Sequence, residues 1–223
     1  GSIFGLLGPN GAGKTTTLEI IETLKDATEG TVILDGFDIR DNPDEVKRRI
    51  GIQLQASGFY PNLRLTEILE MFAIMYGVKV DPMAMLKMFN LEEKAKSIFD
   101  SLSGGQKQRF SLATTLINTP KVIFLDEPTT GLDPQARANL WDVIRDIKKQ
   151  GVTIVMTTHY MDEAEQLCDV LAIMDQGKII AQDSPENLIE QLLGRGFERH
   201  TEVRAATLED VFLNLTGRSL REA

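Results

Sequence analysis

The sequence predicts an α/β fold built around a mainly parallel sheet. Four short runs of β-branched and apolar residues have the length and composition of buried strands: residues 3–7, 122–125, 153–157 and 170–174. Between the second and third runs lies a helical pattern that opens with Asp133 as N-cap and Pro134 at the first helical position. Strands that alternate with such helices indicate parallel pairing through right-handed crossovers.

The remaining elements follow from turn and cap signals. Residues 31–34 are predicted as a strand closed by Asp35-Gly36, and residues 175–177 as a turn that folds the strand at 170–174 back on residues 178–182. We expect one tail helix to open at Ser184-Pro185 and another at the capping-box spacing of Thr207 and Asp210.

Residues 65–88 are predicted as helix and contain five of the eight methionines. Methionine adapts its shape to irregular surfaces, so the stretch could form a pliable docking surface. The alternative is an ordinary helical core, and we interpret the methionines in that way because apolar stripes are mostly packing.

Composition excludes several function classes. The formal net charge of -9 argues against a nucleic-acid partner, which would require a basic face. The single Cys168 cannot form an internal disulfide, which favours a reducing, cytosolic setting. The longest apolar runs are far below the ~20 residues of a membrane-spanning helix, so we expect any membrane role to come through a partner.

Residues 8–15 match the phosphate-binding pattern G-x-x-x-x-G-K-[ST]. The loop follows a predicted strand and precedes a helix, a context that disfavours the alternative of a glycine-rich turn with a chance lysine. Backbone N–H groups and a helix N-terminus would bind phosphate, Lys14 would reach the β and γ phosphates, and the Thr15 hydroxyl would ligate Mg²⁺. The predicted nucleotide-binding residues here are Asn10, Gly11, Ala12, Gly13, Lys14, Thr15 and Thr16.

Two carboxylates follow the apolar strand at residues 122–125. Ligands of open α/β sheets bind at the carboxyl ends of strands, where Asp126 could hold Mg²⁺ and Glu127 could orient or deprotonate a water molecule. The alternative is a solvated sheet edge or a helix cap. The strand before them and the phosphate loop upstream favour the catalytic interpretation.

A third motif, Ser103, Gly104, Gly105 and Gln106, lies between the other two. The Ser103 hydroxyl, close backbone approach at the glycines and a helix starting near Gln106 would together bind an anion. Taken alone, the motif could be no more than an N-cap.

The three motifs in this order resemble those of the ATP-binding cassette ATPases, over essentially the whole chain. The resemblance implies a P-loop NTPase core of the RecA-like kind at residues 1–62 and 104–183, with a partial antiparallel β-subdomain. It also implies an inserted helical subdomain at residues 63–103, including the signature loop, and a C-terminal extension at residues 184–223.

The resemblance implies further site residues. Gln55 matches the glutamine that contacts Mg²⁺ and water; Gln53 is the competing candidate, but Gln55 has the family's distance from Gly51. Asp133 falls in the loop that crosses a dimer interface, and His159 matches the histidine that senses the γ-phosphate. His159 also follows a predicted strand, which by itself places it beside Asp126 and Glu127.

His200 has no such setting, and we expect it to face solvent. The predicted catalytic set is Glu127, His159, Gln55 and Lys14, and the predicted metal ligands are Thr15, Gln55 and Asp126. The cofactors implied are ATP and Mg²⁺.

The partners are also implied by the resemblance. Each ATP would lie between Lys14 of one copy and Ser103 of another, in a homodimer or a heterodimer with a related ATPase. A separate membrane permease would dock on the helical segment, at the cytoplasmic face of the membrane. The tail at residues 207–218 is similar to that of ATPases serving bacterial multidrug or antibiotic exporters, so we expect export.

Two other functions fit the sequence less well. Cassette proteins of ribosomes or chromosomes carry two cassettes or a coiled coil, and a regulatory module without turnover would lack Glu127 or His159. The resemblance also implies an upstream aromatic residue that stacks on adenine, and the sequence begins at Gly1 without it. Such stacking is worth ~1 to 3 kcal/mol, so we expect weaker ATP binding by the chain as given.

Overall fold

A computed structural model describes residues 1–53, 59–197, 211 and 214–215. The helices and strands occur in this order: β1 (Ile3–Leu7), α1 (Lys14–Ile21), β2 (Ile33–Leu34), β3 (Phe37–Asp38), α2 (Pro43–Lys47), β4 (Ile50–Gln53), α3 (Leu65–Tyr76), α4 (Pro82–Met88), α5 (Gly104–Thr115), β5 (Val122–Asp126), α6 (Pro134–Lys149), β6 (Thr153–Thr158), α7 (Met161–Leu167), β7 (Val170–Asp175), β8 (Lys178–Asp183) and α8 (Pro185–Gly194). Short 3₁₀ turns at Glu92–Lys94 and Phe99–Ser101 precede α5.

The main sheet has six strands in the order β4-β5-β6-β1-β7-β8. Its first five strands are parallel, and β8 pairs with β7 in the antiparallel sense, as the predicted hairpin requires. A separate antiparallel pair, β2 and β3, forms a small second sheet. The predicted α/β fold with a mainly parallel sheet is therefore confirmed.

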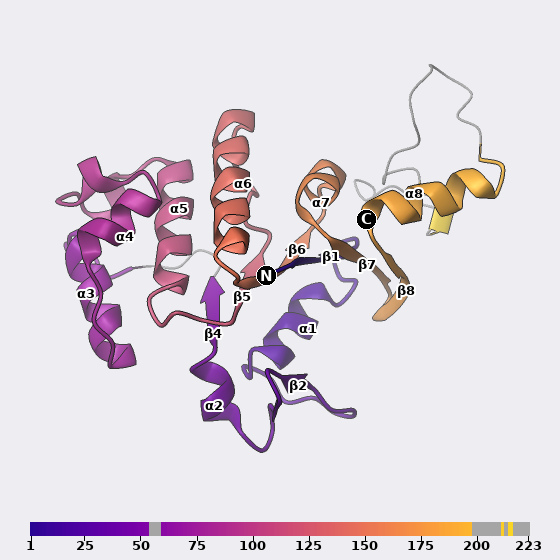
Figure 1. The fold of residues 1–223 in the computed structure, drawn as a ribbon, viewed down its shortest axis with the longest axis horizontal. Helices are drawn as coiled ribbons and strands as arrows, with labels where there is room; N and C mark the ends of the chain where they lie inside the picture. The colour runs from indigo at the N-terminus through magenta and orange to yellow at the C-terminus, as the bar shows by residue number, and fades with distance from the viewer. Residues whose placement is uncertain (54–58, 198–210, 212–213, 216–223) are drawn as a thin grey trace.

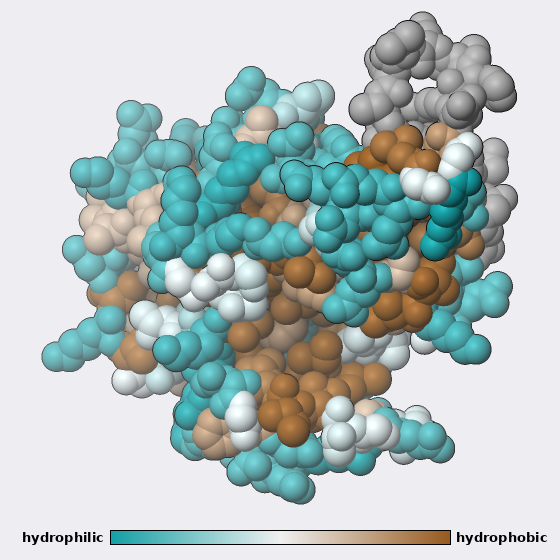
Figure 2. Space-filling model, turned by 45° about the vertical axis from the view of Figure 1, so that its right-hand side comes forward, coloured by the Kyte–Doolittle hydropathy of each residue, from teal (hydrophilic) through white to brown (hydrophobic). Residues whose placement is uncertain are grey.

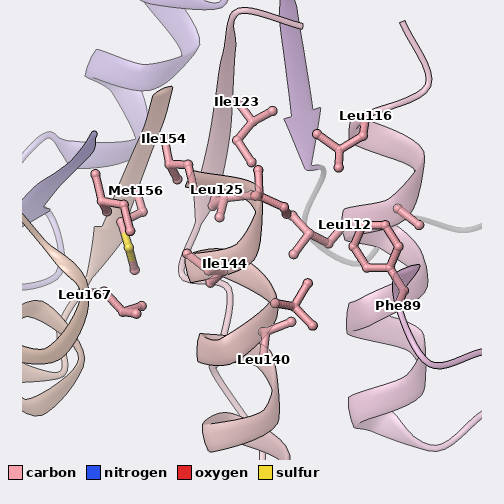
Figure 3. Close-up of a cluster of buried hydrophobic side chains, with 14 of the residues drawn as sticks. Phe89, Leu112, Leu116, Ile123, Leu125, Leu140, Ile144, Ile154, Met156 and Leu167 are labelled. Carbon is pink, nitrogen blue, oxygen red and sulfur yellow. The ribbon is translucent and has the colours of Figure 1, made fainter. Parts of the chain in front are cut away.

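Helices cover both faces of the main sheet (Figure 1). Successive side chains of a strand point to opposite faces, so β5 contributes to two cores. Ile123 and Leu125 face α5 and α6 in the larger core shown in Figure 3, whereas Phe124 packs with Leu18 of α1 and Val46 of α2 in a smaller one. Burial on both faces explains why this strand is an uninterrupted apolar run.

The parallel register aligns the carboxyl ends of three neighbouring strands. Leu7, the last residue of β1, pairs with Thr158 of β6, and Asp126, the last residue of β5, pairs with Thr157. The segments that follow these strands therefore start from one edge of the sheet.

The predicted helix at residues 65–88 is wrong in its continuity, because it is two helices. Gly77 ends α3 in the left-handed conformation with φ of 68°, and Asp81 begins α4 by accepting hydrogen bonds from the Met83 and Ala84 backbones. The predicted strand at residues 31–34 is also shorter, at Ile33–Leu34.

The core interpretation of the methionines is wrong for three of the five. The side of α3 that is buried consists of Leu65, Ile68, Leu69 and Ala73. Met75 is 71% exposed, and Met83 and Met88 are 48% and 46% exposed. The general tendency of apolar stripes to be packed does not hold for these three methionines.

Apolar residues are also exposed on other parts of the surface. Leu24 and Ile33 are 56% and 70% exposed, and Ile179 of β8 is 53% exposed. Figure 2 shows apolar patches between hydrophilic regions on the face that it presents. Within the described residues, no helix combines the length and the hydropathy that a membrane span requires.

Candidate functional site

The glycine-rich loop joins the end of β1 to the start of α1. Gly11 and Gly13 have φ of 76° and 105°, a region that glycine adopts without steric cost. Gly13 is the N-cap of α1 and supplies no side-chain cap, so the first N–H groups of the helix face the loop. Such groups, with the helix dipole, favour binding of an anion.

Lys14 lies inside this loop and is only 5% exposed. Its Nζ donates hydrogen bonds to the Gly8 carbonyl at 2.8 Å and the Pro9 carbonyl at 3.1 Å, and it lies 3.9 Å from Glu127 Oε1. Burial lowers the pKa of Lys14, while the nearby charges of Glu127 and Asp126 act to raise it. The ammonium group is therefore held in the loop by its own carbonyls, beside two acids.

Asp126 connects the end of β5 to the start of α1. One carboxyl oxygen accepts a hydrogen bond from Thr15 Oγ1 at 3.2 Å, and the other accepts one from the Thr157 hydroxyl. A hydroxyl and a carboxylate side by side are hard oxygen ligands of the kind that Mg²⁺ prefers. The predicted metal ligands Thr15 and Asp126 are thus brought together.

Glu127 is contacted by a residue of its own loop and by two residues at the end of β6. Its Oε1 lies 3.2 Å from His159 Nδ1, and its Oε2 accepts a hydrogen bond from Thr130 Oγ1 at 3.2 Å. Its backbone N–H donates to Thr157 Oγ1 at 3.0 Å. Glu127 also has φ of 49°, a left-handed conformation that costs a residue with a Cβ roughly 1–2 kcal/mol.

Lys14, Thr15, Asp126, Glu127 and His159 form what we call the carboxyl-edge cluster. They come from the segments that follow β1, β5 and β6, whose carboxyl ends the register aligns. The cluster combines a cation, two carboxylates and an imidazole with the start of α1, whose first N–H groups have no side-chain cap. That combination suits phosphoryl chemistry, in which positioning and charge stabilisation dominate.

Ser103 begins α5 by a reciprocal capping box. Its hydroxyl accepts from the Gln106 backbone at 3.4 Å, and Gln106 Oε1 accepts from the Ser103 backbone at 3.0 Å. A Cβ at Gly105 would come within 3.0 Å of the Ala136 Cβ, so a glycine permits close packing of α5 on α6. Within one copy of the chain, Ser103 therefore acts as an N-cap. This cap does not exclude the predicted binding of an anion.

A groove of about 390 Å³ lies between the starts of α5 and α6. Asp133 caps α6 by accepting from the Ala136 backbone at 2.9 Å. The residues of this α5–α6 groove are Ser103, Gly104, Gly105, Gln106, Arg109, Gly131, Leu132, Asp133, Gln135, Ala136 and Asn139. Among the described residues, no member of the carboxyl-edge cluster lines the groove, so one copy presents two separate sets of predicted site residues.

Some predicted residues fall elsewhere. Gln55, His200 and the Thr207–Asp210 spacing lie outside the described residues. Gln53, the competing candidate, ends β4 and is 6% exposed. Of the nucleotide-binding set, Asn10, Gly11, Thr15 and Thr16 are exposed and Ala12 is buried.

Sequence reasoning missed three residues that contact the cluster or its loop. The Thr157 hydroxyl donates to the Asp126 carboxylate and accepts from the Glu127 backbone N–H. Thr130 donates to the Glu127 carboxylate, and the Gln108 side chain of α5 donates to the Pro128 carbonyl next to Glu127. Only the pairing of Asp126 with Thr157 in the sheet could have identified the first of these, and no local pattern indicates the other two.

Comparison with known protein families matches residues 1–130 to the family described as ABC transporter. A relative from Burkholderia orbicola (strain AU 1054), "Nod factor export ATP-binding protein I", is 36% identical over 274 residues and is matched over 100% of this chain and 90% of its own length. This chain belongs to the ABC transporter family. The resemblance inferred from the three motifs is confirmed.

Further similarities agree with membership in the ABC transporter family. The protein of the same name from Ralstonia nicotianae (strain ATCC BAA-1114 / GMI1000) is 41% identical over 199 residues, 87% of this chain and 62% of its own. A solved ATP-binding subunit of an ABC transporter has a TM-score of 0.80 at 28% identity and covers 96% of this chain and 88% of its own.

A dimeric ATP-binding cassette in a post-hydrolysis state, bound to ADP and Pi, has a TM-score of 0.72 at 29% identity and covers 82% of this chain and 85% of its own. These similarities confirm the P-loop NTPase fold of this ABC transporter subunit, and they confirm its activity as an ATPase.

Proposed function

We propose that the carboxyl-edge cluster hydrolyses ATP, with Glu127 orienting or deprotonating the attacking water and His159 sensing the γ-phosphate. The observation that carries this is that Glu127 Oε1 lies 3.2 Å from His159 Nδ1 and 3.9 Å from Lys14 Nζ. A side chain positioned to accept a proton in the transition state typically raises the reaction rate by about 10²- to 10⁴-fold. Lys14, which bonds two loop carbonyls, would exchange them for β- and γ-phosphate oxygens.

Mg²⁺ fits the oxygen donors of the cluster. The Thr15 hydroxyl and the Asp126 carboxylate lie within one hydrogen bond of each other, and Mg²⁺ is usually held by one or two such groups together with substrate phosphates. Among the described residues there is no group of three or more His, Cys, Asp or Glu that could hold a metal, which favours a site shared with the substrate. We infer that Thr15 and Asp126, with Gln55, would hold the ion, which neutralises phosphate charge.

The complete nucleotide site would form between two copies of the chain, or between this chain and a related ATPase. Support comes from the separation of the carboxyl-edge cluster and the α5–α6 groove in one copy. Support also comes from the dimeric form of the similar cassette bound to ADP and Pi. Ser103 and the start of α5 in one copy would bind the phosphates held by Lys14 of the other.

A membrane permease would bind the helical segment at residues 63–103. Ile74, Met75 and Tyr76 at the end of α3 are 78%, 71% and 47% exposed, and Met83 of α4 is 48% exposed. Exposed apolar side chains that gather into a patch mark interaction sites. We propose residues 1–62 and 104–183 as the ATPase core, residues 63–103 as the docking subdomain and residues 184–223 as an extension.

The relatives named for Nod factor export support export as the direction of transport. The subunit would then lie at the cytoplasmic face of the membrane, held there by the permease. The net charge of -9 disfavours a role at nucleic acid.

Glu127→Gln tests the assignment of the base. The amide keeps the size of the side chain but cannot accept a proton, so we expect phosphate release to fall at least about a hundredfold while ATP still binds. Steady-state release with Mg²⁺ and ATP, together with calorimetric titration of ATP, measures both quantities. Glu93→Gln, at an exposed acid, is the matched control. Wild-type turnover in the Glu127→Gln protein would remove Glu127 from the proposed role.

A further inference from the structure

Glu163 is a fully buried acid on the first turn of α7. Its exposure is 0%, although glutamate is almost never fully buried unless it is paired. Burial raises the pKa of its carboxyl, while hydrogen bonding by Thr158, Thr129 and Trp141 and the charge of Arg137 act to lower it. Glu163 lies outside the carboxyl-edge cluster, and a fully buried carboxyl adds nothing to the solubility of the surface. Its presence therefore points to a role in the interior of the protein.

The contacts of Glu163 come from three segments. Trp141 of α6 donates its Nε1–H to Oε1 at 3.1 Å. The Thr158 hydroxyl, at the end of β6, and the Thr129 hydroxyl, in the loop after β5, act on the same carboxyl. Within the described residues, Oε2 and Thr129 Oγ1 are both buried without a hydrogen bond of good geometry. The hydrogen bond from Trp141 to Oε1 is thus formed, whereas Thr129 Oγ1 lies near the carboxyl without a hydrogen bond to Oε2.

Each of these three segments leads directly to a residue of the proposed site. Thr158 immediately precedes His159, and Thr129 lies two residues after Glu127. Trp141 lies two turns into the helix that Asp133 caps. The Glu163 carboxyl thus contacts the segments that carry the proposed base and the proposed phosphate sensor, and the helix whose start lines the α5–α6 groove.

The surroundings of Glu163 are also fixed by Arg137 of α6. Its guanidinium donates to Asp162 Oδ2 at 3.2 Å and lies 4.3 Å from the centre of the Tyr160 ring, next to His159. It places a positive charge near the buried carboxyl, which offsets part of the cost of burying an acid. Through Arg137 and Trp141, α6 therefore contacts the residues that directly follow His159.

We propose that Glu163 is a positioning residue for ATP hydrolysis, holding the segment that carries His159 in fixed relation to the loop that follows Glu127. This inference rests on the proposed function of those two residues. A buried acceptor shared by several segments fixes their relative positions more firmly than packing alone, because an unpaired partner would be left without water. Thr129 Oγ1 and Glu163 Oε2, both buried without a partner, are the two groups that would bond each other in this arrangement.

Glu163→Leu and Glu163→Gln form the decisive pair. Leucine removes both acceptor oxygens, and glutamine keeps one for the Trp141 N–H and an amide for the threonine hydroxyls. We expect kcat of Glu163→Leu to fall roughly tenfold or more, since displacement of a site group by about 1 Å can cost 10²-fold. We expect the KM for ATP to stay within about twofold, and Glu163→Gln to recover most of kcat.

A stability control separates positioning from general damage. Ile147→Val shortens a buried side chain near the far end of α6, 1% exposed, and is expected to lower the melting temperature without changing kcat. Where Glu163→Leu does not fold, Thr129→Val carries the test, because it removes only the unaligned hydroxyl. Its kcat is also expected to fall several-fold with KM unchanged.

Different outcomes would contradict the positioning role of Glu163 and the proposed role of Glu127. If wild-type protein hydrolyses Mg²⁺-ATP and Glu163→Leu or Thr129→Val keeps wild-type kcat, Glu163 is not a positioning residue. The same conclusion follows if Glu163→Gln loses as much kcat as Glu163→Leu, because the hydrogen bonds would then be irrelevant. If Glu127→Gln itself keeps wild-type kcat, the proposed function fails instead.

Discussion

The carboxyl-edge cluster and the α5–α6 groove contain the two halves of the proposed site, and they are built differently. The cluster depends on contacts between segments far apart in the sequence, such as Glu127 with His159 and Asp126 with Thr15. The groove depends on two local caps, in which Ser103 bonds the Gln106 backbone and Asp133 bonds the Ala136 backbone. Substitutions in the strands of the sheet should therefore disturb the carboxyl-edge cluster. Substitutions at the N-caps of α5 and α6 should disturb the groove.

Thr157→Val should lower stability and turnover more than a change at either local cap, because Thr157 contacts both Asp126 and Glu127. The change keeps the shape of the side chain but removes the hydroxyl that bonds Asp126 and the Glu127 backbone. A buried donor or acceptor left without its partner costs about 1–3 kcal/mol. We expect the free energy of unfolding to fall by that amount and kcat to fall roughly tenfold, as measured by urea unfolding and phosphate release.

Thr153→Val, at the other end of β6, is the matched control for strand propensity and shape. It should change neither quantity by more than a small amount. Equal losses of kcat in both variants would show that β6 acts only through its stability, and that the contacts of Thr157 have no special part in the cluster.

Ser103→Ala should have a smaller effect, confined to the groove. The loss of an N-cap typically costs about 1 kcal/mol, so we expect a small fall in melting temperature. Binding of ATP to a single copy should not change, since Ser103 lies outside the carboxyl-edge cluster, whereas turnover should fall. Nucleotide titration of dilute protein and phosphate release at high protein concentration separate the two effects.

Ser184→Ala provides the control for the cap itself. Ser184 begins α8 with the same kind of bond, to the Asn187 backbone at 3.2 Å, and lies outside the groove. Its loss should lower stability by a similar amount and leave turnover intact. If the two variants lose turnover equally, the groove has no role in hydrolysis.

Glu22→Gln should have the smallest effect on turnover and should change only the pH dependence of stability. Glu22 follows α1, and burial, together with the charges of Asp126 and Glu19, raises the pKa of its carboxyl to about 7. A raised pKa in the folded state means that stability present below the unfolded pKa of 4.5 is lost as pH rises towards about 7. The substitution should therefore raise the melting temperature at pH 8 relative to wild type, and that advantage should shrink as pH falls towards 4.5.

Thermal unfolding between pH 4.5 and pH 8 measures this difference. Glu190→Gln, at an exposed acid of α8, should show no such dependence on pH. A melting-temperature difference for Glu22→Gln that does not vary with pH would show that folding does not change the pKa of Glu22.

Local signals in the sequence were sufficient for much of the fold. The strand at residues 3–7, the caps at Asp133 and Ser184 and the hairpin of β7 and β8 all appear at their predicted positions. The prediction of one continuous helix at residues 65–88 is wrong because Gly77 ends α3 in the left-handed conformation and Asp81 begins α4. The core interpretation of Met75 is wrong because the apolar character of a side chain does not show which face of a helix is covered.

The sequence by itself determined the chemistry of this protein: which residues follow which strands, in what order, and hence its membership in the ABC transporter family. These features depend on near neighbours in the chain, which a linear pattern records. Only the tertiary structure decided that Thr157 bonds the Asp126 carboxylate and the Glu127 backbone, and that Glu163 is buried against Trp141. Those contacts join segments through strand register and helix packing, and no local spacing encodes either.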